Sequence, residues 1–104
     1  MSTPRTLLLC DDDTRFRERL AKALAARAYE VLAAAGHEQA LQLARERNIE
    51  RAIVDLKMPG PGGLVLIRDL LALQPGIELV VLTGYGSIAT AVEAMRLGAR
   101  DYLT

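Results

Sequence analysis

Ala52-Ile53-Val54-Asp55-Leu56-Lys57-Met58-Pro59-Gly60 is a short apolar run that ends in one carboxylate and is stopped by proline and glycine. Such a run is typical of a strand buried on both faces of a parallel sheet. Asp55 then lies at the carboxyl end of the strand, where open α/β sheets bind ligands. Asp11-Asp12-Asp13 follows another apolar run, Leu7-Leu8-Leu9-Cys10, and is expected at the same edge.

Length and composition bound the possible classes of protein. A chain of 104 residues is one domain, and its 13 basic residues balance its 13 acidic ones. Zero net charge gives no overall field that would attract nucleic acid or an anionic membrane. The single Cys10 has no internal disulfide partner, and no run approaches the length of a membrane span. We therefore expect a soluble cytoplasmic protein that contacts neither nucleic acid nor a membrane directly.

Strand-like and helix-like segments alternate along the chain. Strands are expected at residues 6–10, 29–34, 52–55, 77–82 and from 101 onward, with helices between them. Asp13 or Thr14 is expected to cap the first helix. Its apolar positions recur every four residues, at Phe16, Leu20, Leu24 and Ala28. Its other residues, expected on a solvated face, are Arg15, Arg17, Glu18, Arg19 and Lys22. The alternation predicts a parallel sheet with helices on both faces.

The parallel sheet brings distant polar residues to one edge. Asp11, Asp12, Asp55 and Thr83 each follow or end a predicted strand. Crowded carboxylates repel one another unless a cation neutralises them, and an all-oxygen site favours Mg²⁺. One carboxylate could then attack a phosphoryl group, with Asp55 the candidate and the Thr83 hydroxyl a donor. Taken singly, the acidic run could equally be a capping, solvated turn.

Four motifs together resemble the receiver domain of two-component response regulators. They are Leu7-Leu8-Leu9-Cys10-Asp11-Asp12-Asp13, then Val54-Asp55-Leu56-Lys57-Met58-Pro59-Gly60 with Gly63, then Val81-Leu82-Thr83-Gly84, and Gly98-Ala99-Arg100-Asp101-Tyr102. The resemblance covers residues 1–104. It implies an α/β, flavodoxin-like (CheY-like) doubly wound parallel sheet with strand order 2-1-3-4-5.

The resemblance also implies the chemistry of the site. A sensor histidine kinase would donate its phosphoryl group to Asp55, and Mg²⁺ would be held by Asp11, Asp12, Asp55 and the backbone carbonyl of Lys57. The chain would be a phosphoacceptor rather than an enzyme, with self-catalysed phosphotransfer and autodephosphorylation.

A switch is implied by the same resemblance. Thr83 would be the switch hydroxyl and Tyr102 the switch aromatic residue. Together they would change a face formed by residues 88–102 and so control an output domain, of DNA-binding type, outside this chain.

The sequence departs from the family pattern at its end. Family members continue into a Lys-Pro pair and a fifth helix, whereas this sequence stops at Thr104. We therefore expect a receiver domain truncated before the last helix. Loss of that helix should expose apolar surface on Leu7, Leu9 or Leu103 and favour self-association.

Two other functions compete with this interpretation. Hydrolases with an aspartate nucleophile after the first strand need Asp-x-Asp-x-Thr or Val, but here the fifth position is Arg15, so the pattern fails. A receiver-like interaction module that is not phosphorylated stays open for the truncated chain. Labelling with a phosphodonor separates this module from a phosphoacceptor.

Overall fold

The computed structural model describes residues 5–58, 62–82 and 88–103. Strands and helices alternate through them, as predicted. In chain order the elements are β1 (Arg5–Cys10), α1 (Thr14–Ala25), β2 (Tyr29–Ala34), α2 (His37–Glu46), β3 (Arg51–Asp55), α3 (Gly62–Leu73), β4 (Glu78–Leu82), α4 (Ile88–Leu97) and β5 (Asp101–Leu103). Among the described residues no helix follows β5.

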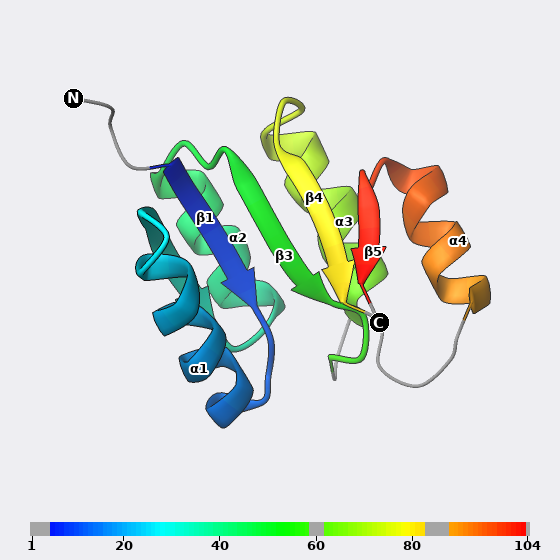
Figure 1. Ribbon diagram of the computed structural model, residues 1–104. Coiled ribbons are helices and arrows are strands. Elements are labelled where there is room, and N and C mark those ends of the chain that lie inside the picture. The colour runs from blue at the N-terminus through cyan, green and yellow to red at the C-terminus, as the bar shows by residue number, and fades with distance from the viewer. Residues whose placement is uncertain (1–4, 59–61, 83–87, 104) are drawn as a thin grey trace.

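All five strands form one parallel sheet in the order β2-β1-β3-β4-β5, which confirms the predicted order (Figure 1). The register aligns Cys10 of β1 with Val54 of β3. The residues that come next, Asp11 and Asp55, therefore leave neighbouring strands at the same level of the sheet. The carboxyl edge is where the two acidic segments meet.

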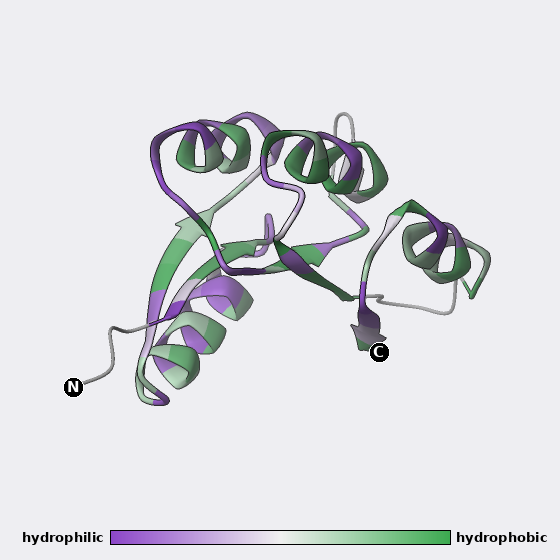
Figure 2. Cartoon of the chain, turned by 90° about the horizontal axis from the view of Figure 1, so that it is seen from above, coloured by the Kyte–Doolittle hydropathy of each residue, from purple (hydrophilic) through white to green (hydrophobic). Residues whose placement is uncertain are grey.

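The helices cover the sheet unequally. α2, α3 and α4 lie on one face and α1 lies on the other, over β1 and β2 (Figures 1 and 2). The main core fills the space under α2, α3 and α4. Its largest buried side chains include Leu8, Val54, Leu66, Ile67, Leu70 and Leu79. Alternate residues of β3 and β4 point into this core, which fits strands with one well-covered face.

The opposite face of β3, β4 and β5 is open. Ile53 and Val80 are only half-buried there, and Leu103 is 50 % exposed. A hollow of about 170 Å³ runs between these residues and α1. The expectation that Leu103 is exposed is confirmed. The same expectation is wrong for Leu7 and Leu9, which are 3 % and 0 % exposed, because α1 packs over that side of β1.

The first helix differs from its predicted form. Asp13 is its cap, since the side-chain Oδ1 accepts a hydrogen bond of 3.0 Å from Phe16 N–H. The helix ends at Ala25, and Ala28 has a φ of 69°. The apolar spacing, which predicted that the helix includes Ala28, was therefore wrong about the last turn. None of the twelve residues of α1 is fully buried. Since it is the one helix on its face among the described elements, no neighbouring helix covers its flank.

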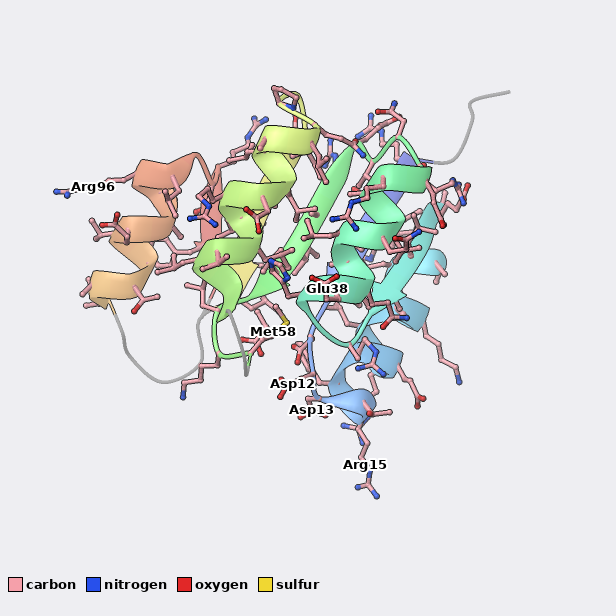
Figure 3. The ribbon with its side chains drawn as sticks, turned by 180° about the vertical axis from the view of Figure 1, so that it is seen from behind. Asp12, Asp13, Arg15, Glu38, Met58 and Arg96 are labelled. Carbon is pink, nitrogen blue, oxygen red and sulfur yellow. The ribbon has the colours of Figure 1, made fainter. Side chains whose placement is uncertain are left out.

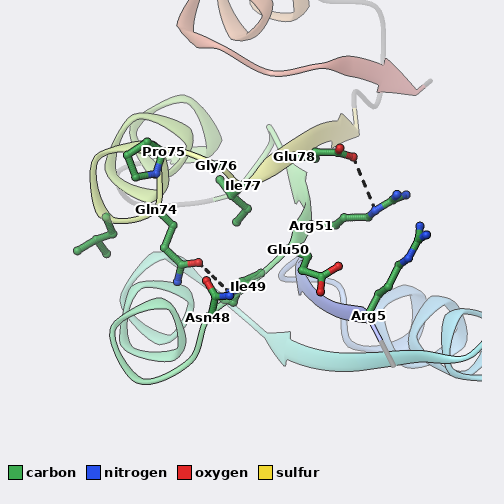
Figure 4. A pocket seen from close by; sticks show the side chains of 11 residues that line it. Arg5, Asn48, Ile49, Glu50, Arg51, Gln74, Pro75, Gly76, Ile77 and Glu78 are labelled. Carbon is green, nitrogen blue, oxygen red and sulfur yellow. Dashed lines mark hydrogen bonds and ion pairs between the residues drawn. The ribbon is translucent and has the colours of Figure 1, made fainter. Parts of the chain in front are cut away.

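The amino edge of the sheet carries no part of the acidic site. A hollow of about 690 Å³ lies there, walled by the loops before β3 and β4 (Figure 4). Gln74 connects these loops: its side chain donates to Ala44 O and Arg47 O and accepts from Ile49 N–H.

The described helices include none with the length and hydropathy of a membrane-spanning segment.

Candidate metal centre

Three carboxylates meet at the carboxyl edge of β1 and β3. Asp11 and Asp12 directly follow β1, and Asp55 is the last residue of β3. Each offers an oxygen atom, and these oxygens lie within 4.8 Å of one another. The structure thus brings together the three acidic residues that the sequence had placed at one edge.

The acidic turn after β1 is held by its own hydrogen bonds. Asp11 N–H donates to Ala34 O at 3.1 Å, and Oδ1 of Asp11 accepts from Asp13 N–H at 2.9 Å. Arg17 Nη1 donates to the backbone oxygen of Asp11 at 2.8 Å. Asp12 and Asp13 lie side by side at this end of the molecule (Figure 3). The turn is therefore fixed from β2 on one side and from α1 on the other.

A tight turn also fixes Asp55. Lys57 N–H donates to Asp55 Oδ1 at 3.0 Å, and Leu56 N–H donates to Leu82 O at 3.1 Å. Gly63, in the first turn of α3, lies against this turn. A Cβ at Gly63 would stand 2.6 Å from Asp55 O and 2.7 Å from Leu56 Cα. Only a glycine lets α3 approach this closely.

Burial and charge disfavour the ionised form of Asp11. Its pKa lies above the ordinary value, first because burial removes water from the carboxylate and then because Asp55, Asp12 and Asp13 are negative. The Asp13 N–H bond opposes this rise. A cation bound to the carboxylate oxygens would offset both the loss of hydration and the repulsion between the carboxylates. Three carboxylates, two of them partly open to water, fit Mg²⁺ or Ca²⁺, which take carboxylate, carbonyl and water ligands.

Two buried sulfur atoms lie beneath the site. Cys10 Sγ is 3.3 Å from Met58 Sδ and 3.5 Å from Gly36 O. Burial, reinforced by the charge of Asp11, raises the pKa of the Cys10 thiol to about 12. The thiol is therefore protonated at neutral pH and is not a metal ligand there. The contact joins the end of β1 to the turn after Asp55.

Of the two predicted switch residues, Tyr102 lies within the part of the chain that the structure describes and Thr83 lies outside it. Thr83, Pro59 and Gly60 lie outside the described residues. Tyr102 belongs to β5, pairs with Val81, and is 45 % exposed. The roles of Thr83 and Tyr102, and of the Lys57 carbonyl, stay predictions.

Sequence reasoning did not predict the contacts that three residues make around the site. Arg17 was expected on a solvated face, but it is half-buried and binds Asp11. Met58 and Gly63 are buried against the two acidic segments. One signal for Arg17 was available in the sequence: it is a basic residue in the first turn of the helix that follows the acidic run. Gly63 belongs to the motif that carries the resemblance, but the motif by itself indicates no contact with the Asp55 backbone.

Comparison with known proteins gives a consistent result. The model of the response regulator receiver domain family matches residues 7–104. The photosynthetic apparatus regulatory protein RegA of Cereibacter sphaeroides is 41 % identical over 104 residues, which are 100 % of this chain and 56 % of RegA. The chain spans about half the length of ActR of Rhizobium meliloti and of RegA, two curated relatives that it matches.

Solved structures of response regulators share this fold. A response regulator of Burkholderia pseudomallei, with a phosphorylated aspartic acid, a calcium ion and citrate, matches 95 % of this chain and 58 % of its own, at a TM-score of 0.90 and 43 % identity. The response regulator TrrA of Thermotoga maritima, in complex with Mg²⁺-BeF, matches 96 % of this chain and 85 % of its own, at a TM-score of 0.85 and 26 % identity.

Proposed function

The chain belongs to the response regulator receiver domain family, and from this membership we propose that it accepts a phosphoryl group from a sensor histidine kinase on Asp55. The observation that supports this proposal is the meeting of Asp11, Asp12 and Asp55 at one edge of the sheet. Receiver domains act in phosphorelay signalling, and a relative of known structure carries a phosphorylated aspartic acid.

The proposed transfer uses the two oxygens of Asp55 differently. Oδ1 is held by the Lys57 N–H at 3.0 Å. Oδ2 attacks the phosphorus of the phosphohistidine, forming a P–O bond while the P–N bond breaks, and the imidazole leaves with the bond's electron pair and takes up a proton. Attack of water on the phosphorus of the acyl phosphate then breaks the new P–O bond, releases inorganic phosphate and restores the Asp55 carboxylate. Both steps are proposed to proceed on the receiver itself, which is a phosphoacceptor rather than a separate enzyme.

The proposed metal is Mg²⁺. Asp11, Asp12, Asp55 and the backbone carbonyl of Lys57 would hold it, and when bound it would neutralise charge on the transferring phosphoryl group. The proposal is supported by the hydrogen bonds that hold the two acidic segments: Asp11 N–H donates to Ala34 O, Arg17 donates to Asp11 O, and Lys57 N–H donates to Asp55 Oδ1.

The proposed output surface is the face of α4 and β5. Its exposed apolar side chains are Ile88, Val92, Met95, Leu97 and Tyr102. We propose that phosphorylation draws Thr83 inward, that Tyr102 turns with it, and that this face then controls an output domain. RegA is a regulatory protein about twice as long as this chain, which leaves room for such a domain.

The open face of β3, β4 and β5 supports a further part of the proposal. With Ile53 and Val80 half-buried and Leu103 exposed, the 104-residue chain is proposed to self-associate through this face.

Intact mass after incubation with Mg²⁺ and acetyl phosphate tests the phosphorylation. We expect one phosphoryl adduct on the chain, none on Asp55→Ala, and none when EDTA replaces Mg²⁺. Glu50→Gln is the matched control, because it removes an exposed carboxylate at the opposite edge of the sheet. It should be labelled like the unchanged chain.

An adduct that persists in Asp55→Ala would contradict the assignment of the acceptor. No adduct on the unchanged chain would favour the alternative function, a receiver-like interaction module that is not phosphorylated. Addition of a purified histidine kinase in place of acetyl phosphate then tests the proposed donor.

A further inference from the structure

Arg17 binds both ends of the acidic turn. Its backbone N–H donates to Asp13 O at 2.9 Å, and its side-chain Nη1 donates to Asp11 O at 2.8 Å. It is half-buried, whereas Arg15 and Arg19 on the same helix are exposed. Figure 3 shows Arg15 pointing away from the molecule. Arg17 is thus distinguished from its neighbours by geometry and not by residue type.

The oxygen that Arg17 holds belongs to the peptide group that joins Asp11 to Asp12. Because a peptide group is planar, fixing its oxygen limits rotation of the whole group. The far side of that group is the backbone nitrogen of Asp12. The direction in which Asp12 leaves the backbone therefore depends on the Arg17 bond.

The two aspartates rely on this bond to different degrees. Asp11 is buried, and its carboxylate is also fixed by the Asp13 N–H. Asp12 is exposed, so packing contributes little to its position. A long planar guanidinium that reaches from α1 is well suited to hold the carbonyl.

We propose that Arg17 is a positioning residue for the metal: it holds the Asp11–Asp12 peptide so that the Asp12 carboxylate faces Asp55 before Mg²⁺ binds. This inference rests on the proposed function, because it assumes that the three carboxylates hold a cation. It assigns Arg17 no contact with the metal or the phosphoryl group.

The test is a Mg²⁺ titration followed by the thermal unfolding midpoint and, independently, by calorimetry. Loss of a residue that orients a metal ligand typically weakens metal affinity by about tenfold, so Arg17→Gln should raise the half-saturating Mg²⁺ concentration by about tenfold. Arg17→Lys keeps the charge but loses the planar fork, and we expect a rise of about threefold. Arg15→Gln removes the same charge from an exposed, screened position and should change the concentration by less than about twofold.

Several outcomes would overturn the inference. If Arg17→Gln lowers the unfolding midpoint without metal but leaves the half-saturating concentration unchanged, Arg17 only stabilises the fold. Tighter Mg²⁺ binding by Arg17→Gln would mean that Arg17 competes with the metal. If Arg17→Gln does not fold, Arg17→Lys decides: an unchanged concentration overturns the proposal and a raised one supports it.

The measurements distinguish a wrong role for Arg17 from a wrong proposal of phosphoryl transfer. Absence of any Mg²⁺ response in the unchanged chain overturns both. A Mg²⁺ response that is equal in the unchanged chain and Arg17→Gln overturns the role of Arg17 alone. Metal binding that depends on Arg17, without a phosphoryl adduct on Asp55, supports the role of Arg17 and contradicts the proposed transfer.

Discussion

The carboxylates of Asp11, Asp12 and Asp55 repel one another at the carboxyl edge when no cation is bound. Asp11 is buried beside Asp12 and Asp55, so ionisation of its carboxyl group raises the free energy of the folded state. The pKa of Asp11 is raised in the folded state. A carboxyl group with a raised pKa contributes stability below its ordinary pKa and loses that contribution as pH rises through the folded value.

Asp11→Asn should therefore stabilise the metal-free protein at neutral pH. The amide oxygen can still accept the Asp13 N–H, and one negative charge is gone. We expect a gain of about 1 kcal/mol, or roughly 4–8 °C in the unfolding midpoint of a domain this size. In EDTA, the advantage over the unchanged chain should shrink as pH falls toward the ordinary value of 3.8.

Thermal unfolding in EDTA between neutral pH and about pH 4 measures this difference. The same substitution should weaken the stabilising effect of Mg²⁺. A variant less stable than the unchanged chain at neutral pH without metal would contradict the electrostatic account of Asp11.

Cys10 should resist alkylation in the folded protein. Its thiol is fully buried against Met58, and its pKa is raised to about 12, so the reactive thiolate is scarce. We expect iodoacetamide to modify the native chain at least about tenfold more slowly than the urea-unfolded chain at pH 8. Since the sequence has one cysteine, the mass increase reports on this site alone. Equal rates would show that the end of β1 opens readily.

At the scale of elements, the position of α3 depends on one glycine. The first turn of α3 lies against the Asp55–Leu56 backbone, where a Cβ at Gly63 has no space. α3 also supplies Leu66, Ile67 and Leu70 to the core. A displaced α3 would disturb both the core and the turn that carries the acceptor.

Gly63→Ala should destabilise the fold by about 2 kcal/mol, because the added methyl group meets backbone atoms that have little room to move. Urea unfolding measures this change. Gly76→Ala is the matched control, since nothing lies within 4 Å of its Cβ position, and it should stay within about 0.5 kcal/mol. Equal effects of the two substitutions would contradict the close approach of α3.

At the scale of the whole molecule, the coverage of the sheet is asymmetric. Three helices lie on one face, whereas α1 alone among the described helices lies on the other (Figure 2). The apolar surface of β3, β4 and β5 that α1 does not reach favours association with another surface.

Sedimentation equilibrium tests the proposed self-association. The unchanged chain should form dimers or larger species, and Leu103→Lys should weaken the association by at least about tenfold, or about 1.4 kcal/mol, because it puts a charge where apolar area is buried. Leu73→Lys is the matched control: Leu73 is 44 % exposed, similar to Leu103, but lies at the end of α3. Equal weakening by both substitutions, or a monomeric unchanged chain, would contradict this use of the open face.

The sequence by itself determined the order of strands and helices, the parallel sheet and the edge at which Asp11, Asp12 and Asp55 meet. These features follow from local signals: apolar runs of strand length, glycine and proline breaks, and the rule that parallel strands end at one edge. The resemblance of the motifs supplied the strand order. The exact end of α1 was mispredicted because the spacing of apolar residues continues past the backbone reversal near Ala28.

Only the tertiary structure decided which residues support the site and which face stays open. Arg17 binds Asp11, Met58 contacts Cys10, and Gly63 lies against the Asp55 backbone. The contact of Met58 with Cys10 joins two residues that are far apart in the chain. Leu7 and Leu9 are buried while Leu103 is exposed, although all three are apolar strand residues. Burial depends on which helix packs over which face, and that packing is a property of the assembled sheet and not of any local pattern.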